Sequence, residues 1–130
     1  MIVVDSSVWI SHFGEALNPE VLALRSVVQP EAVLVGDLIL LEVLRGARTN
    51  RDAARMEAEL LLFDSVAMSD PGIASQAARN YRMLRAKGIT IRSSVDLIVG
   101  TYCIEHGHQL LHRDRDFLHM EQLGLESYSA

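Results

Sequence analysis

The chain has 130 residues, of which 49% are apolar and 22% are charged, so we expect one domain, residues 1–130, with its own core. The composition excludes a disordered protein, and the lone Cys103 excludes an internal disulfide and a cysteine-based zinc site. No apolar run reaches the roughly 20 residues of a membrane span, which predicts no membrane partner. The first residues show neither a basic region nor a cleavage site, and we therefore expect a cytoplasmic protein.

The formal net charge of −5 is unevenly distributed along the chain. Residues 45–92 contain nine basic and five acidic side chains, whereas the rest of the chain contains three basic and twelve acidic ones. Eleven of the twelve basic residues are arginine, whose planar guanidinium group suits phosphate. The pattern is compatible with a nucleic-acid partner, and equally with solvated helix faces.

Along the chain, short apolar runs that predict strands alternate with patterns that predict helices. The first strand, 2–4, is followed by helices at 6–13 and 19–28, and the second strand, 32–35, by helices at 37–44 and 51–62. The remaining expected elements are a strand at 63–68, helices at 69–88 and 93–106, a strand at 109–112, a helix at 114–123 and an edge strand at 126–128. Strands separated by helices favour right-handed crossovers. We therefore predict a three-layer α/β/α sandwich with a short, mainly parallel central sheet.

Four acidic residues fall where such a sheet binds ligands, beyond the carboxyl ends of its strands. Asp5 directly follows the first predicted strand, and Asp114 follows the fourth. Asp96 lies in the first turn of a predicted helix, and Glu42 lies in a helix that is apolar almost all round, where an unpaired carboxylate is costly. Each residue also has a structural alternative, which is helix capping for the three aspartates and a salt bridge to a nearby arginine for Glu42.

The four carboxylates are more informative together than singly. Two unit charges about 4–5 Å apart repel by about 3–4 kcal/mol at an effective dielectric near 20. Four carboxylates gathered in one place therefore need one or two hard divalent cations, and oxygen-only ligands suit Mg²⁺ or Mn²⁺. Such a site can activate water and neutralise charge on a phosphodiester.

Four segments resemble, in order and spacing, the PIN-domain nucleases: Met1–Val8, Glu42–Gly46, Asp96–Val99 and Arg113–Phe117. The short chain and the Glu-Val-Leu-Arg-Gly segment are most similar to the VapC toxins of VapBC toxin–antitoxin pairs. The resemblance implies a Rossmann-like fold, a Mg²⁺- or Mn²⁺-dependent endoribonuclease that cuts RNA, a VapB-type antitoxin partner and a homodimer. The site residues that it implies are Asp5, Glu42, Asp96 and Asp114, with Asp116 as their neighbour.

Within this resemblance, we expect Asp5 and Asp96 to hold the principal cation, while Glu42 and Asp114 complete the site and Asp116 lies beside it. Asp96 or Glu42 could accept the proton of the attacking water. The candidates for binding the RNA backbone are Arg45, Arg48, Arg113 and Arg115. At position 112, where many relatives have threonine, this chain has His112, a candidate for orienting a ligand or water.

Two other functions remain open from the sequence. A Mg²⁺-dependent phosphotransferase would use Asp5 as its nucleophile, but such enzymes usually place a second aspartate two residues later, where this chain has Ser7. They also need a lysine near the site, and the only lysine is Lys87. A non-catalytic interaction module would use the acidic residues only as caps and surface ion pairs, and would show no cation binding that depends on Asp5 and Asp96.

Overall fold

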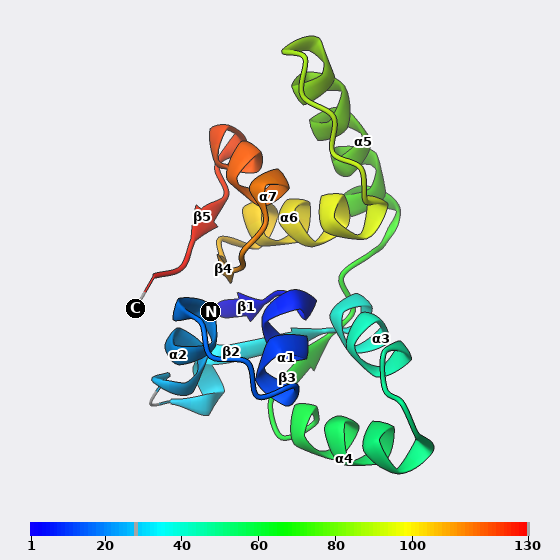
Figure 1. Cartoon of the computed structure of the whole chain (residues 1–130). Coiled ribbons are helices and arrows are strands. Elements are labelled where there is room, and N and C mark those ends of the chain that lie inside the picture. Colours follow the sequence, from blue (N-terminus) through cyan, green and yellow to red (C-terminus); the bar gives the residue numbers. More distant parts are fainter. Residues whose placement is uncertain (28, 130) are drawn as a thin grey trace.

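The computed structural model describes residues 1–27 and 29–129. Its strands are all parallel and form one sheet in the order β3–β2–β1–β4–β5 (Figure 1). The strands are β1 (Ile2–Val4), β2 (Val33–Gly36), β3 (Asp64–Val66), β4 (Gln109–Leu111) and β5 (Glu126–Ser127). The direction in which successive strands are added reverses between β1 and β4. Such a switch point leaves a crevice at the carboxyl ends of the two strands, where ligands bind in open α/β sheets.

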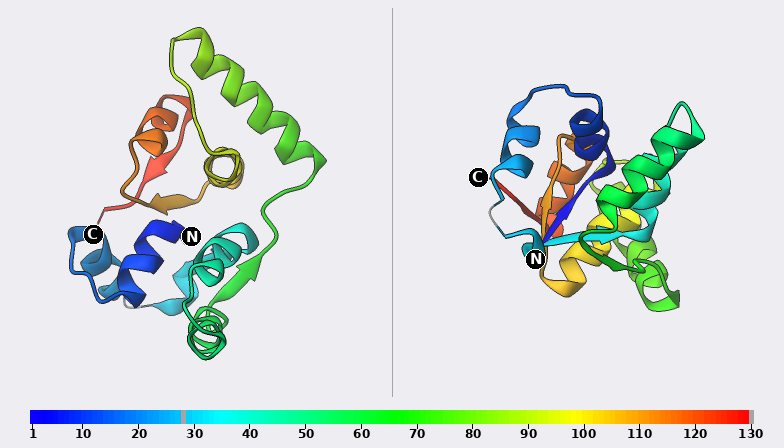
Figure 2. Two further views of the ribbon diagram at one scale, coloured as in Figure 1. Left: turned by 45° about the vertical axis from the view of Figure 1, so that its right-hand side comes forward. Right: turned by 90° about the horizontal axis from the view of Figure 1, so that it is seen from below.

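Helices cover both faces of the sheet, which confirms the predicted three-layer sandwich. In Figure 2, α1, α2 and α4 lie on one side of the sheet, and α6 and α7 lie on the other. Helix α3 begins directly at the end of β2 and contacts α1 and α4, whereas α5 packs on α6. The helices are α1 (Ser6–Phe13), α2 (Pro19–Arg25), α3 (Asp37–Arg45), α4 (Asn50–Leu60), α5 (Pro71–Ala86), α6 (Ser94–His106) and α7 (Arg115–Met120), with short 3₁₀ turns η1 (Pro30–Ala32) and η2 (Glu121–Leu123).

The end of α2 differs from the sequence prediction. The helix was expected to reach Val28, which lies outside the described residues, but it ends at Arg25. The Ser26 hydroxyl group donates to the carbonyl oxygen atoms of Leu22, at 2.7 Å, and Ala23, at 3.1 Å. Such local side-chain bonds compete with helix continuation.

Other predicted elements are present with shifted ends. The strand expected at 63–68 pairs only over Asp64–Val66, and the helix expected at 114–123 divides into α7 and η2. Asp37, the residue expected to cap the helix predicted at 37–44, is instead the first residue of α3, and Gly36 is its N-cap. The Asp37 carboxylate instead accepts a hydrogen bond from the Met68 backbone N–H at 3.0 Å, which ties the end of β2 to the segment after β3.

The hydrophobic core lies on both sides of β1. Val3 and Val4 are fully buried, as expected for the central strand of a parallel sheet covered by helices. Trp9 of α1 fills one side of the core, and Phe117 of α7 belongs to the same continuous apolar cluster. The chain therefore leaves β1 at a buried position, and the next residue, Asp5, is only 4% exposed. In the part of the chain that the structure describes, no helix is long and apolar enough to cross a membrane.

Candidate active site

Asp5 is held where β1 passes into α1. Its backbone N–H donates to the Leu111 carbonyl at 2.9 Å, so pairing between β1 and β4 continues to this residue. Oδ2 of Asp5 accepts hydrogen bonds from the Ser7 backbone N–H at 3.3 Å and from the Ser7 hydroxyl at 2.6 Å. Asp5 therefore caps α1, as the structural alternative predicts. Capping accounts for only one of its carboxylate oxygens, because Oδ1 is buried without a hydrogen-bond partner among the described residues.

Glu42 reaches the same place from α3. Its Oε1 atom accepts a hydrogen bond of 2.9 Å from the Ser6 hydroxyl, which belongs to the first turn of α1. Its Oε2 atom lies 3.9 Å from Nη2 of Arg45, whose side chain is 70% exposed. An ion pair that long and exposed contributes little stability. The predicted salt bridge is thus present, but it does not neutralise Glu42.

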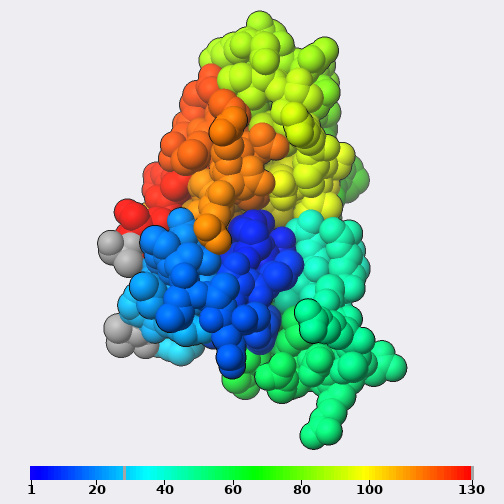
Figure 3. Space-filling view, viewed as in Figure 1, coloured from blue at the N-terminus to red at the C-terminus, as the bar shows by residue number. Residues whose placement is uncertain are grey.

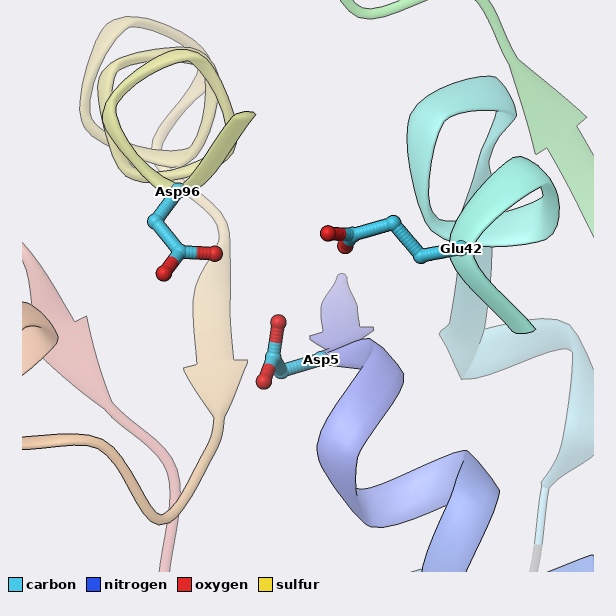
Figure 4. A group of neighbouring side chains, drawn as sticks. All are labelled: Asp5, Glu42 and Asp96. Atoms are coloured by element: carbon cyan, nitrogen blue, oxygen red, sulfur yellow. The ribbon is translucent and has the colours of Figure 1, made fainter. Parts of the chain in front are cut away.

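Asp96 completes a cluster of three carboxylates. It lies in the first turn of α6, where its backbone N–H donates to the Ser93 hydroxyl at 3.2 Å. Figure 4 shows the side chains of Asp5, Glu42 and Asp96 pointing toward one another from three different elements. Each offers one oxygen atom, and these atoms all lie within 4.8 Å of one another. The structure thus brings together three of the four acidic residues expected at the site.

Burial and mutual repulsion make this cluster electrostatically unfavourable when it is ionised. Burial, together with the neighbouring negative charges of Asp5, Asp114, Glu42 and Asp116, raises the pKa of Asp96 to about 7. Burial also raises the pKa of Asp5, against the opposing effect of its hydrogen bonds from Ser7. Carboxylates with raised pKa values in a crevice indicate a site that lacks positive charge.

Asp114 and Asp116 lie at the rim of this cluster. Asp114 caps α7, and its Oδ1 atom accepts from the Asp116 backbone N–H at 2.9 Å. Asp114 is outside the group of three carboxylates, yet its charge raises the pKa of both Asp5 and Asp96. The β4–α7 connection therefore adds negative charge to the site from a second side.

His112 fixes the start of that connection. Its Nδ1 atom is 3.2 Å from the Asp114 backbone nitrogen, and its Nε2 atom is 2.7 Å from the Ser127 hydroxyl oxygen. A backbone N–H can only donate, so Nδ1 accepts and the proton of the neutral ring is on Nε2. Burial lowers the pKa of His112, which favours this neutral form. The ring thereby links Asp114 to the edge strand β5.

The four arginines expected to contact RNA do not form one surface. Arg45 lies beside Glu42, and Nε of Arg113 is 3.3 Å from Oε2 of Glu20 on α2. Arg115 lines an open groove of about 790 Å³ together with the acidic rim. Arg48 lines a different cavity, between α1, α3 and α4. Of the four, Arg115 has the position that best agrees with the prediction.

Four further residues at the site were not selected from the sequence. The Ser6 and Ser7 hydroxyl groups orient the carboxylates of Glu42 and Asp5, and their position directly after Asp5 was the available signal. Arg92 and His119 line the groove that contains Arg115. Neither carries a local pattern that separates it from ordinary surface residues.

The arrangement can hold a divalent cation. It offers oxygen atoms only, at mutual distances that one small ion can bridge, and Asp5 also has a buried Oδ1 atom without a hydrogen-bond partner among the described residues. A hard cation would supply both the missing partner and the missing positive charge. Fold and site thus define a Rossmann-like α/β protein with a carboxylate cluster at its switch point.

Comparison with known proteins identifies the family. Residues 2–123 match the model of the PIN domain, and the chain belongs to the PIN-domain family. It is 29% identical over 119 residues to Ribonuclease VapC11 from Mycobacterium tuberculosis, covering 90% of this chain and 89% of the relative. The fold is similar to that of FitAcB from Neisseria gonorrhoeae, with a TM-score of 0.76, 18% identity and coverage of 99% and 97% of the two chains. It is also similar to that of VapBC2 from Rickettsia felis bound to a promoter DNA fragment, with a TM-score of 0.74, 13% identity and coverage of 98% of each chain.

Proposed function

We propose that this protein is a metal-dependent endoribonuclease that hydrolyses RNA phosphodiester bonds and acts as the toxin of a type II toxin–antitoxin system. The observation that carries the proposal is the carboxylate cluster of Asp5, Glu42 and Asp96, together with the buried and unpartnered Oδ1 atom of Asp5. Membership of the PIN-domain family and the relative named as a ribonuclease support the same activity. Residues 1–130 form the single nuclease domain of this proposal.

The proposed cofactor is Mg²⁺, for which Mn²⁺ can substitute. Asp5, Glu42 and Asp96 would supply its oxygen ligands, with Asp114 and Asp116 completing the acidic rim. When bound, such a cation lowers the pKa of a water molecule and offsets charge on the phosphodiester. All five groups are carboxylates, and this donor set favours Mg²⁺ or Mn²⁺ over softer metals.

The chain's own residues orient this site and compensate its charge. The Ser6 and Ser7 hydroxyl groups hold Glu42 and Asp5 in place through the hydrogen bonds described above. His112 holds the backbone of Asp114. Arg45, Arg48, Arg113 and Arg115 were the candidates for contacting the RNA backbone, and Arg115, which lines the groove beside the acidic residues, keeps that role in the proposal. Because the site is acidic, RNA binding should depend strongly on the cation and on salt.

The proposed partner, besides RNA, is a VapB-type antitoxin, and the proposed assembly is a homodimer. Support comes from the similarity to VapBC2 of Rickettsia felis and to a toxin–antitoxin complex from Klebsiella pneumoniae, which has a TM-score of 0.63. An enzyme that cuts cellular RNA and is restrained by a protein partner would act in the cytoplasm.

The two alternative functions receive less support. In the phosphotransferase hypothesis, the position two residues after Asp5 should carry a carboxylate, but Ser7 donates a hydrogen bond to Asp5 there. Nζ of Lys87 donates to Oε1 of Gln122 at 3.0 Å rather than to an acidic residue of the cluster. The interaction-module hypothesis explains why Asp5 and Asp114 cap helices, but it leaves the buried Oδ1 atom of Asp5 without a role.

The decisive experiment compares the wild-type protein, Asp5→Asn and Asp64→Asn for cleavage of labelled RNA with Mg²⁺ and for Mn²⁺ binding by calorimetry. Asp64 is exposed on β3 and serves as the matched control. Residues that only orient metal ligands typically contribute 10–100-fold, so Asp5→Asn should reduce cleavage by about 100-fold or more and weaken Mn²⁺ binding. Full-rate cleavage by Asp5→Asn would contradict the proposal.

A further inference from the structure

The groove beside the acidic cluster is lined by side chains of both charges. Asp96, Asp114 and Asp116 line it together with Arg92, Arg115 and His119. One wall is the 88–93 segment between α5 and α6, and the other is α7. Figure 3 shows these two segments, in yellow-green and orange, next to each other on one face of the molecule. The groove thus shares Asp96 with the carboxylate cluster of the proposed cleavage site.

The two arginines of the groove are free to bind a ligand. Across the described residues, neither Arg92 nor Arg115 takes part in an ion pair or a side-chain hydrogen bond, and both are exposed. Arg113, in contrast, is paired with Glu20 at 3.3 Å. Two unpaired guanidinium groups flanking carboxylates provide a place for an anion at a short distance from the cluster.

Burial and hydrogen bonds hold the 88–93 segment, which forms one wall of the groove, in place. Ile91 is only 4% exposed and anchors the segment in the core. Nη1 of Arg85 donates to the Thr90 hydroxyl at 3.2 Å, and Nζ of Lys87 donates to Oε1 of Gln122 at 3.0 Å. The second bond joins the end of α5 to η2, directly after α7. The groove is therefore formed before any ligand enters, and less ordering is needed on binding.

We propose that this groove binds the single-stranded RNA segment adjoining the cleaved phosphodiester, with Arg92 and Arg115 contacting successive phosphates. The proposal rests on the proposed nuclease function and names where its substrate lies. A polyanion that reaches a carboxylate cluster must place its other phosphates where positive charge is available, and these two arginines provide it. Asp116 and the Thr90 hydroxyl in the groove can accept hydrogen bonds from ribose hydroxyl groups.

The test measures binding of a short fluorescent single-stranded RNA as a function of salt, in an Asp5→Asn background that prevents cleavage. Arg92→Gln and Arg115→Gln are compared with Arg51→Gln, which removes an exposed arginine on α4. For single strands, each phosphate contact contributes about 0.7 to the slope of log K against log salt. Each groove variant should therefore reduce the slope by about 0.7 and weaken binding about threefold to tenfold at low salt, while Arg51→Gln changes neither.

Two results would overturn the inference. Slopes that are unchanged in both groove variants, or reduced equally by Arg51→Gln, would show that RNA lies elsewhere or binds without a defined path. Duplex RNA that binds as tightly as the single strand, and loses as much affinity in the groove variants, would exclude recognition of a single strand.

If circular dichroism shows that the Asp5→Asn variants are unfolded, the same series is measured in the wild-type background with Ca²⁺. Cleavage by the wild-type protein with Mg²⁺ is assayed in parallel, so failure of the groove and failure of the nuclease proposal give different results.

Discussion

The Ser6 hydroxyl group donates a 2.9 Å hydrogen bond to Oε1 of Glu42, and this bond joins α1 to α3 directly beside the carboxylate cluster. Without it, the Glu42 side chain would keep only its 3.9 Å contact with exposed Arg45. The bond therefore orients a partly buried carboxylate. Hydrogen bonds of this kind orient metal ligands and are typically worth 10–100-fold in metal affinity or activity.

We expect Ser6→Ala to weaken Mn²⁺ binding and slow RNA cleavage by about tenfold, with little effect on stability. Calorimetry and a cleavage assay measure the two effects. Ser69→Ala is the matched control, because Ser69 is exposed before α5 and forms no side-chain hydrogen bond with the described residues. Equal Mn²⁺ affinity in Ser6→Ala and the wild-type protein would show that Glu42 needs no such support.

His112 leads to a second prediction, because it holds Asp114 through an acceptor atom. In His112→Asn, the side-chain oxygen can take the place of Nδ1 and accept from the Asp114 backbone N–H, whereas His112→Leu offers no acceptor. We expect His112→Leu to reduce Mn²⁺ affinity and the cleavage rate by about tenfold and His112→Asn to retain most of both. Equal losses in the two variants would indicate that ring packing against Phe117, at a centroid distance of 5.1 Å, matters instead.

The sequence predicts the sheet and part of the acidic site for a simple physical reason. Asp5 and Asp114 follow strands that pair directly in the sheet, so strand prediction alone brings them to one edge. The position of Glu42 depends on how α3 leaves β2, and the only local signal was a carboxylate within an otherwise apolar helix. The pairing of Arg113 with Glu20 joins residues far apart in sequence, and no local pattern encodes it.

The ends of several helices and strands are shifted for a related reason, which is that individual side-chain hydrogen bonds set them. Ser26 ends α2 through its own hydroxyl group, and Asp37 accepts a hydrogen bond from Met68 rather than capping α3. The bonds of Ser26 are local and that of Asp37 needs a tertiary partner, but apolar periodicity reports neither, because it shows only which face is buried. Arg92 illustrates the limit for function, because its place in the groove follows from the packing of the 88–93 segment against the core.

The raised pKa of Asp96 predicts how stability changes with pH in protein without a cation. Its folded-state pKa of about 7 lies above the ordinary value of 3.8 for this carboxyl group. The folded state therefore binds more protons between these two values, and the free energy of unfolding should fall as the pH rises from about 4 to about 7. Asp96→Asn removes the ionisable group and with it this part of the pH dependence.

Thermal unfolding with EDTA measures this effect. At about pH 8, we expect Asp96→Asn to be more stable than the wild-type protein by about 1 kcal/mol, or about 3–5 °C in Tm. At about pH 4, the difference in stability between the two proteins should be smaller. This value allows for solvent screening of a partly exposed group. Added Mn²⁺ should raise the Tm of the wild-type protein above pH 7 and have little effect on Asp96→Asn. A lower Tm for Asp96→Asn than for the wild-type protein in EDTA at about pH 8 would be inconsistent with a repulsive cluster.

The spacing between α6 and α7, which carry or adjoin the acidic residues, depends on Gly100. A Cβ atom at this position would lie 2.5 Å from both Sδ and Cε of Met120, a side chain that is fully buried. Gly100→Ala must therefore displace Met120 or separate the helices, and such overpacking typically costs about 1–3 kcal/mol. A helix gains up to about 1 kcal/mol from replacing glycine by alanine, which offsets part of the loss.

We therefore expect Gly100→Ala to lower the free energy of unfolding by about 1–2 kcal/mol and, where the helices separate, to weaken Mn²⁺ binding by moving Asp96 away from Asp114. Chemical denaturation and calorimetry measure the two effects. Gly46→Ala is the control, since its Cβ would meet the Val43 carbonyl oxygen at an ordinary 3.5 Å. In a Met120→Ala background, the same glycine substitution should cost less, because the clashing atoms are gone. An unchanged cost there would locate the strain elsewhere than at the contact between α6 and α7.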